Sequence, residues 1–111
     1  MLKQTQRLRS RADFRRVYTR GRSHVHPLLV LHVWRRQDAE RRFGFSVSKK
    51  LGGSVVRNRI KRRLREACRG RLESLAPGFD AVVVARAPSR AASFGQLQSA
   101  LDELLRQSGL L

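Results

Sequence analysis

The stretch from Lys49 to Arg71 limits the possible folds of this chain more than any other segment. It carries ten basic residues and one acidic residue. At 100° per residue, its apolar side chains gather on one side of a helix: Val56, Ile60, Leu64 and Ala67, with Cys68 at the margin. The opposite side is basic. Such a helix must pack its apolar stripe on a core and leave its basic side at the surface.

Apolar runs and helix-breaking residues predict the remaining elements. The expected elements are a helix over 11–20 capped by Ser10 and closed by Gly21, a strand over 28–34, a strand over 42–48, the basic helix over 54–75, a strand over 80–86 and a last helix from the Ser93–Gln96 capping box to Gly109. This order, with 111 residues, predicts one α+β domain spanning residues 1–111.

The expected strand over 42–48 has one face made only of small residues. Phe43, Phe45 and Val47 alternate with Gly44, Ser46 and Ser48. Small side chains on a sheet face leave room for a ligand to lie on it.

The charge indicates a polyanionic partner. Lys and Arg number 25 against 8 Asp and Glu, a formal net charge of +17, and 18 of the 25 cations lie in residues 1–22 and 49–71. Self-repulsion of this size favours binding to nucleic acid, or secondly to an anionic membrane surface. A solvated helix face normally mixes charge signs, but only Glu66 interrupts the cations here. With Asn58 as the single amide among them, the helix suits RNA phosphates better than DNA bases.

Several classes of function are not supported by the sequence. No apolar run approaches the roughly 18 residues of a membrane span, and the N-terminus has no apolar signal segment, so we expect a cytoplasmic protein. The single Cys68 faces the expected core, and His24 and His26 lack a third ligand. There is no phosphate-binding glycine loop and no close carboxylate pair. We therefore expect no metal site and no catalytic residue in the protein itself.

Two aromatic residues in the first helix allow two interpretations. Phe14 and Tyr18 share one helical face beside Arg11 and Arg15. They could belong to the core, or they could stack on the bases of a single strand whose backbone is tracked by the arginines. Val17 could supply the packing side instead. On the strand over 28–34, His32 and Trp34 could extend the same aromatic surface.

The sequence FGFSVSKKLGGSVVRNRIKRRLREACR closely resembles the signature of the protein subunit of bacterial ribonuclease P. The stretches DFRRVYTRGR and VVVARAP resemble two further recurring segments of that family. The resemblance implies an αβββαβα fold shared with small ribosomal RNA-binding domains. It also implies a left-handed β–α–β crossover, against the usual rule, and an additional short strand near 22–26.

The resemblance implies the function as well. The family's protein binds a catalytic RNA, and that RNA, with its Mg²⁺, removes the 5′ leader of precursor tRNA. The protein would then be a non-catalytic monomer in a one-to-one complex with the RNA, and it would bind no cofactor itself. The residues implied to bind the catalytic RNA are Lys49, Lys50, Arg57, Asn58, Arg59, Lys61, Arg62, Arg65 and Arg69. Those implied to form the leader-binding cleft are Arg11, Phe14, Arg15, Tyr18, His32, Ser46, Ser48 and Arg86.

Two other functions remain open at this stage. A structural RNA-binding protein of the ribosome would not support leader cleavage when mixed with a ribonuclease P RNA. A DNA-compacting protein would bind duplex DNA as well as folded RNA.

Overall fold

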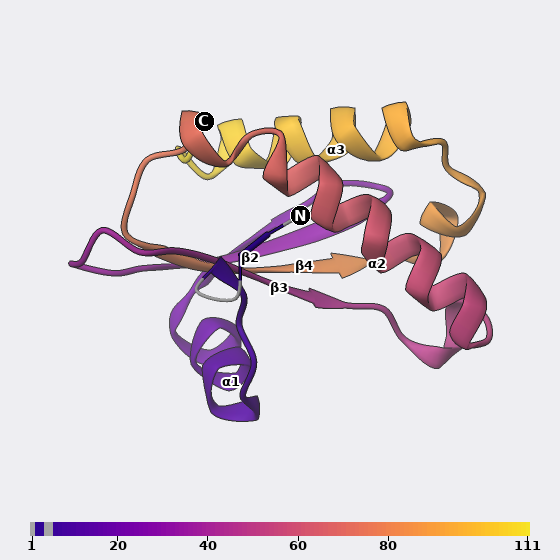
Figure 1. The fold of residues 1–111 in the computed structure, drawn as a ribbon, viewed down its shortest axis with the longest axis horizontal. Coiled ribbons are helices and arrows are strands. Elements are labelled where there is room, and N and C mark those ends of the chain that lie inside the picture. The colour runs from indigo at the N-terminus through magenta and orange to yellow at the C-terminus, as the bar shows by residue number, and fades with distance from the viewer. Residues whose placement is uncertain (1, 4–5) are drawn as a thin grey trace.

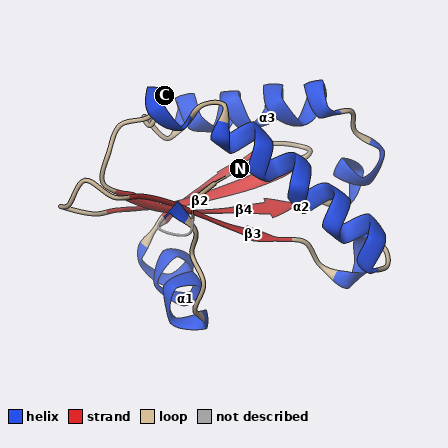
Figure 2. Ribbon diagram, in the orientation of Figure 1, coloured by secondary structure: helices blue, strands red, loops and turns tan. Residues whose placement is uncertain are grey.

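The computed structural model describes residues 2–3 and 6–111, which form one sheet covered by helices on both faces (Figures 1 and 2). The helices and strands are α1 (Arg11–Arg20), β1 (Arg22–Val25), β2 (Leu29–Arg35), β3 (Arg41–Ser46), α2 (Ser54–Arg69), β4 (Phe79–Ala85) and α3 (Phe94–Gln107). Short 3-10 turns lie at η2 (Lys49–Leu51), η3 (Leu72–Ser74) and η4 (Ala87–Ala91). The predicted αβββαβα order, including the short strand β1, is confirmed.

The strand order in the sheet is β1-β2-β4-β3. β1 pairs antiparallel with β2, and β2 pairs antiparallel with β4. β3 is parallel to β4, and α2 lies between them in the chain. β4 is thus a central strand. Its near-continuous apolar sequence fits this position, because six of its seven residues are buried.

The sheet separates two apolar clusters of unequal size. The larger one joins α2 and α3 to the sheet face that carries Leu29, Leu31 and Phe43. The smaller one lies under α1 and contains the buried residues Leu8, Val17 and Val82. In Figure 1, α2 and α3 accordingly lie on one side of the sheet and α1 lies on the other.

The basic helix is shorter than the sequence predicts. α2 ends at Arg69 and not at Leu75, with Gly70 as its C-cap. Gly70 is a poor helix former, and Arg71 beyond it turns to α3, where its guanidinium contacts the Asp102 carboxylate at 2.9 and 3.0 Å. That pair favours a turn here, and the chain continues as η3.

The helix caps agree with the sequence, whereas the end of the third strand does not. The Ser10 hydroxyl accepts a hydrogen bond from the Asp13 amide, and Ser93 forms the predicted capping box with Gln96. β3 ends at Ser46, so the prediction of a strand through Ser48 is wrong. The Ser48 side chain instead accepts a hydrogen bond from the Lys50 amide and starts η2. Local capping therefore outweighs the alternation that suggested a longer strand.

No helix in the described part of the chain is both long enough and apolar enough to cross a membrane.

Candidate nucleic-acid interface

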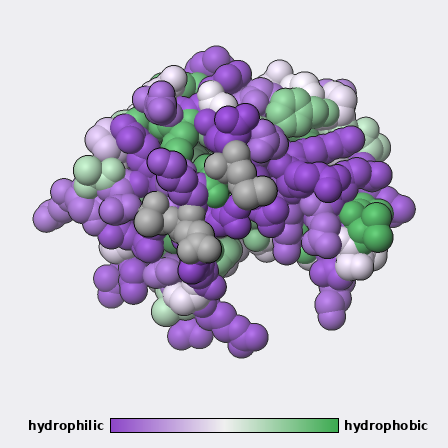
Figure 3. Space-filling view, viewed as in Figure 1, coloured by the Kyte–Doolittle hydropathy of each residue, from purple (hydrophilic) through white to green (hydrophobic). Residues whose placement is uncertain are grey.

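The outer side of α2 is a continuous basic surface, which we call the α2 basic face. Its apolar side is buried through Ile60, Leu64, Ala67 and Cys68. Of the predicted RNA-binding residues, the exposed ones are Lys49, Lys50, Asn58, Arg59, Arg62 and Arg69, and the half-buried ones are Arg57, Lys61 and Arg65. Figure 3 shows hydrophilic side chains covering this side of the molecule along α2. The structure therefore brings the predicted set together on one helix and on the turn that precedes it.

Few carboxylates neutralise this face. Arg69 contacts Glu66 at 3.1 Å, and both side chains are about half exposed. Within residues 2–3 and 6–111, Arg59 and Arg62 form no ion pair. The buried Nε of Arg57 has no hydrogen-bond partner among the described residues. An array of unpaired guanidinium groups suits the phosphates of a folded RNA.

On the other face of the sheet, α1 packs closely over Gly44 of β3. A Cβ placed on Gly44 would lie 2.5 Å from the Phe14 ring. Phe14 packs against the smaller apolar cluster, and Val17 of the same helix is fully buried in it. The expected free space above Gly44 is thus filled by the half-buried ring of Phe14.

Tyr18 is the member of the aromatic pair that reaches solvent, with 42% of its surface exposed. Its ring centroid lies 6.5 Å from that of Phe14 and 4.9 Å from that of His32, edge to face with the latter. We call the adjoining hollow the α1 groove. It has a volume of about 390 Å³ and is lined by Arg9, Arg11, Phe14, Arg15 and Tyr18. Exposed rings with arginines beside them can stack on bases and contact phosphates.

His32 is neutral over a wider pH range than a free histidine. It is half-buried, and the loss of solvent around the ring lowers the pKa of the side chain from its usual value near 6.5. At pH 7 the ring that contacts Tyr18 is therefore uncharged.

The other predicted cleft residues lie at the carboxyl ends of the two parallel strands. Ser46 pairs in register with Val84. Ser48 and Arg86 each follow two residues later, so they flank the same end of the sheet. The exposed Arg86 donates from its guanidinium to the His26 carbonyl at 3.1 Å. Ser48 and Arg86 do not line the α1 groove but lie beyond this end of the sheet.

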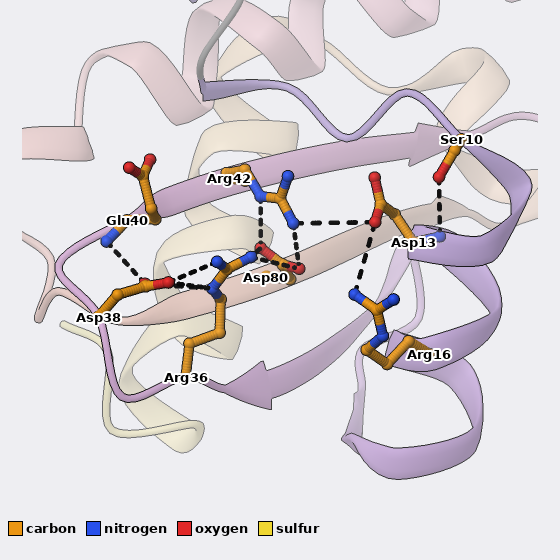
Figure 4. A network of polar contacts seen from close by, with 8 residues as sticks. All are labelled: Ser10, Asp13, Arg16, Arg36, Asp38, Glu40, Arg42 and Asp80. Carbon is orange, nitrogen blue, oxygen red and sulfur yellow. Dashed lines mark hydrogen bonds and ion pairs between the residues drawn. The ribbon is translucent and has the colours of Figure 1, made fainter.

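A buried carboxylate ties α1 to the sheet (Figure 4). Asp80 on β4 is fully buried and accepts two hydrogen bonds of 2.8 Å from Arg42 and two of 3.2 Å from Arg36. Arg42 also approaches Asp13 of α1 at 3.9 Å, and Asp13 lies 3.6 Å from Arg16. Arg36 also donates to Asp38, and this carboxylate is the main cause of the raised pKa of Arg36. The pKa of Arg42 is raised chiefly by Asp80.

The cysteine, the histidines and the carboxylates of the described residues have defined surroundings. Among the described residues, no three or more His, Cys, Asp or Glu side chains gather as a metal site. Cys68 is fully buried, and burial raises the pKa of its thiol, so it is not a nucleophile. His26 is engaged locally, because its Nδ1 accepts from the Leu28 amide and its Nε2 lies 3.3 Å from Glu103.

Some residues on the α1 side of the sheet were not predicted from the sequence. Val30 and Val84 are half-buried, and they pair with each other across β2 and β4 in the row of the sheet that ends at Ser46. Val30 lies two residues from His32, and Val84 lies two residues from Val82, so the spacing in the sequence places each pair on one sheet face. The roles of Arg9, which lines the α1 groove, and Asp80 had no such signal, because they depend on how α1 packs.

Comparison with known proteins agrees with this geometry. The profile of the ribonuclease P protein family matches residues 2–109. The ribonuclease P protein component of Herpetosiphon aurantiacus is 45% identical over 109 residues, covering 98% of this chain and 89% of the relative. That of Clostridium botulinum is 41% identical, covering 94% and 95%.

Solved structures show the same fold. The ribonuclease P protein of Staphylococcus aureus superposes with a TM-score of 0.87 at 33% identity, covering 95% of this chain and 96% of that one. The protein from Thermotoga maritima gives a TM-score of 0.84 at 30% identity, covering 91% and 96%. The chain therefore belongs to the family of the protein component of bacterial ribonuclease P, the ribonucleoprotein endoribonuclease that matures the 5′ ends of tRNAs.

Proposed function

We propose that this protein binds the ribonuclease P RNA through the α2 basic face and the 5′ leader of precursor tRNA through the α1 groove. The observation that carries the proposal is the placement of two different RNA-compatible surfaces on opposite faces of one sheet. Each is suited to a different form of RNA, so one protein can contact both at once.

The α2 basic face suits a folded RNA. From Arg57 to Arg69, its exposed and half-buried side chains are all cations except Asn58 and Glu66, and such a row contacts phosphates without reading bases. The flanking Lys49 and Lys50 extend the same charge beyond the start of α2. The partner implied by membership of the family is the ribonuclease P RNA.

The α1 groove suits a single strand. Tyr18 offers an exposed ring, and Arg11 and Arg15 lie beside it on the same helix. A 5′ leader is unpaired, so its bases are free to stack, whereas the bases of mature tRNA are mostly paired. Arg86 and Ser46, at the carboxyl ends of the parallel strands, would extend the path of the leader.

The catalytic chemistry belongs to the RNA in this proposal. The protein supplies positive charge and position, and Mg²⁺ is held by RNA phosphates. We assign one protein to one catalytic RNA, because a single α2 basic face and a single α1 groove account for both contacts.

Reconstitution tests the proposal directly. The protein is mixed with a bacterial ribonuclease P RNA at low Mg²⁺, and removal of a precursor tRNA leader is followed. We expect cleavage to be faster with the protein than with RNA alone, and preference for precursor over mature tRNA to rise. If the protein binds the RNA without accelerating cleavage, it acts as a structural RNA-binding protein and the proposal is wrong. Equal affinity for duplex DNA would indicate a DNA-compacting protein.

A further inference from the structure

One aromatic residue on the α1 side of the sheet has no part in the function proposed above. Trp34 follows His32 by two residues on β2, so both side chains point from the same sheet face. It lies in register with Asp80, next to the turn between β2 and β3. Trp34 is the only tryptophan of the chain and is half-buried.

Two adjoining hollows open beside this indole. The larger has a volume of about 640 Å³ and is lined by Arg16, Trp34, Arg35, Arg36, Gln37 and Asp38. The smaller has a volume of about 340 Å³ and is lined by Arg20, Arg22, His24, Val33, Trp34, Arg35 and Ser108. Both volumes fall in the range of about 300–1,000 Å³ that is usual for small-ligand sites. We call the pair the Trp34 hollow.

Helix α1 separates the Trp34 hollow from the α1 groove. Viewed along the helix at 100° per residue, Arg16 and Arg20 fall on one side of the buried Val17. Phe14 and Tyr18 fall on its other side. A ligand in the Trp34 hollow would therefore lie across α1 from a strand bound beside Tyr18.

The side chains around Trp34 combine a flat stacking surface with free positive charge. The Arg16 guanidinium lies over the indole, 5.4 Å from the ring centroid. Both an indole and a guanidinium plane stack on nucleobases. Within the described residues, Arg20 and Arg22 form no ion pair, and Arg35 donates only to the Ser108 carbonyl at 3.2 Å. These three guanidinium groups are thus available to a phosphate.

We propose that the Trp34 hollow binds an unpaired RNA nucleotide, with its base stacked on the Arg16–Trp34 pair and its phosphate held by Arg35 together with Arg20 or Arg22. The acidic side chains of a peptide would satisfy the arginines but would offer no flat ring to stack on the Arg16–Trp34 pair. The inference rests on the proposed function for its class of ligand. The nucleotide can come from the catalytic RNA or from the precursor tRNA, and the experiment separates these sources.

The intrinsic fluorescence of Trp34 reports on the hollow without a label, because no other tryptophan contributes. The protein is titrated first with a ribonuclease P RNA, and precursor or mature tRNA is then added to the complex. Quenching at the first step, with reduced access of acrylamide to the indole, identifies the catalytic RNA as the source. Quenching only with precursor tRNA identifies the leader, and quenching with both tRNAs identifies the tRNA body. Unchanged emission and acrylamide access at every step overturn the inference.

Substitutions then separate stacking from packing. Trp34→Leu keeps apolar volume and removes the ring, and we expect affinity at the quenching step to fall about 5- to 150-fold. Trp34→Phe should recover most of that loss. Phe94→Leu is the matched control: Phe94 is 43% exposed on α3, and its loss should leave affinity unchanged. Equal weakening by Trp34→Leu and Trp34→Phe would make Trp34 a packing residue and overturn the inference.

The two proposals fail in different ways. If the wild-type protein does not accelerate leader cleavage, the proposed function is wrong. If it does, while Trp34→Leu matches it in affinity at every step, only the Trp34 hollow is wrong. Should Trp34→Leu melt early, the fluorescence and acrylamide results on the wild-type protein still decide.

Discussion

Two groups of arginines, one on each face of the sheet, are held in opposite ways. On the α1 side, Arg36 and Arg42 are fixed by the buried Asp80, and Arg42 and Arg16 both lie near Asp13. On the α2 side, Arg59 and Arg62 point into solvent, and within residues 2–3 and 6–111 they form no ion pair. A carboxylate neutralises the charge of a paired arginine and fixes the position of its guanidinium. Unpaired arginines keep an uncompensated charge and repel one another. The first arrangement holds α1 and its groove in place on the sheet, and the second suits the binding of a phosphate-rich fold.

The largest expected effect is a loss of stability when the buried carboxylate of Asp80 is removed. Asp80→Ala leaves Arg36 and Arg42 without their buried carboxylate, and we expect the free energy of unfolding to fall by about 3–5 kcal/mol. That loss would lower Tm by roughly 10–30 °C, as measured by circular dichroism.

Asp102→Ala is the matched control for this change. It breaks the ion pair between Arg71, 38% exposed, and Asp102, 13% exposed. We expect the free energy of unfolding to fall by only about 1 kcal/mol. If both substitutions cost the same, the buried carboxylate does not hold the α1 side more firmly than an ordinary surface pair would.

A smaller loss, confined to RNA affinity, is expected on the other face. Arg62→Ala with Arg65→Ala should leave the fold intact, because the buried residues of α2 lie on its opposite side. Affinity for the catalytic RNA should fall, and the slope of log K against log salt should shrink by about one to two units, at roughly 0.7–0.9 per phosphate contact. The double variant Arg90→Ala with Arg106→Ala removes two other exposed arginines and should leave the slope unchanged. Equal slopes for the two double variants would exclude the α2 basic face from the interface.

The α1 groove should show selectivity where the α2 basic face shows only affinity. Tyr18→Ala should weaken precursor tRNA binding by roughly 1–3 kcal/mol, the usual contribution of one base–aromatic stack. Mature tRNA and the catalytic RNA should bind as before. Three titrations and a melting curve on one variant make this comparison. An equal loss for precursor and mature tRNA would show that Tyr18 does not contact the leader.

The smallest effect concerns protonation on the α1 side. Burial lowers the pKa of His32 in the folded protein, so at pH values between the folded pKa and about 6.5 the unfolded chain binds more protons. This contribution to stability is present above pH about 6.5 and is lost as the pH falls through the folded pKa. His32→Gln should remove that part of the pH dependence of Tm. An NMR titration of the His32 ring that gave a pKa at or above 6.5 would contradict the prediction.

Sequence patterns predicted those features that depend on one element or one motif. The apolar stripe of α2, the Ser93–Gln96 capping box and the buried Val17 could all be recognised, because each follows from local periodicity or capping. The packing of Phe14 on Gly44 could not be recognised from the sequence, because it depends on two segments about thirty residues apart. The same holds for the Asp80 network, where Arg36 and Arg42 reach one carboxylate 38 or more residues further along the chain. The early end of α2 also depended on a distant partner, Asp102.

The sheet itself sets a distance. A helix packed on a sheet adds a layer on the order of 10 Å on each side, so the axes of α1 and α2 lie on the order of 20 Å apart. The whole molecule measures only 36 × 26 × 25 Å along its principal axes. A strand beside α1 and an RNA helix against α2 would therefore be held at a separation fixed by buried side chains that neither RNA touches. Enlarging or shrinking core residues such as Phe43 or Leu64 would change that spacing by fractions of an ångström. In the proposed complex, the hydrophobic core would thus set the distance between the two bound RNA segments.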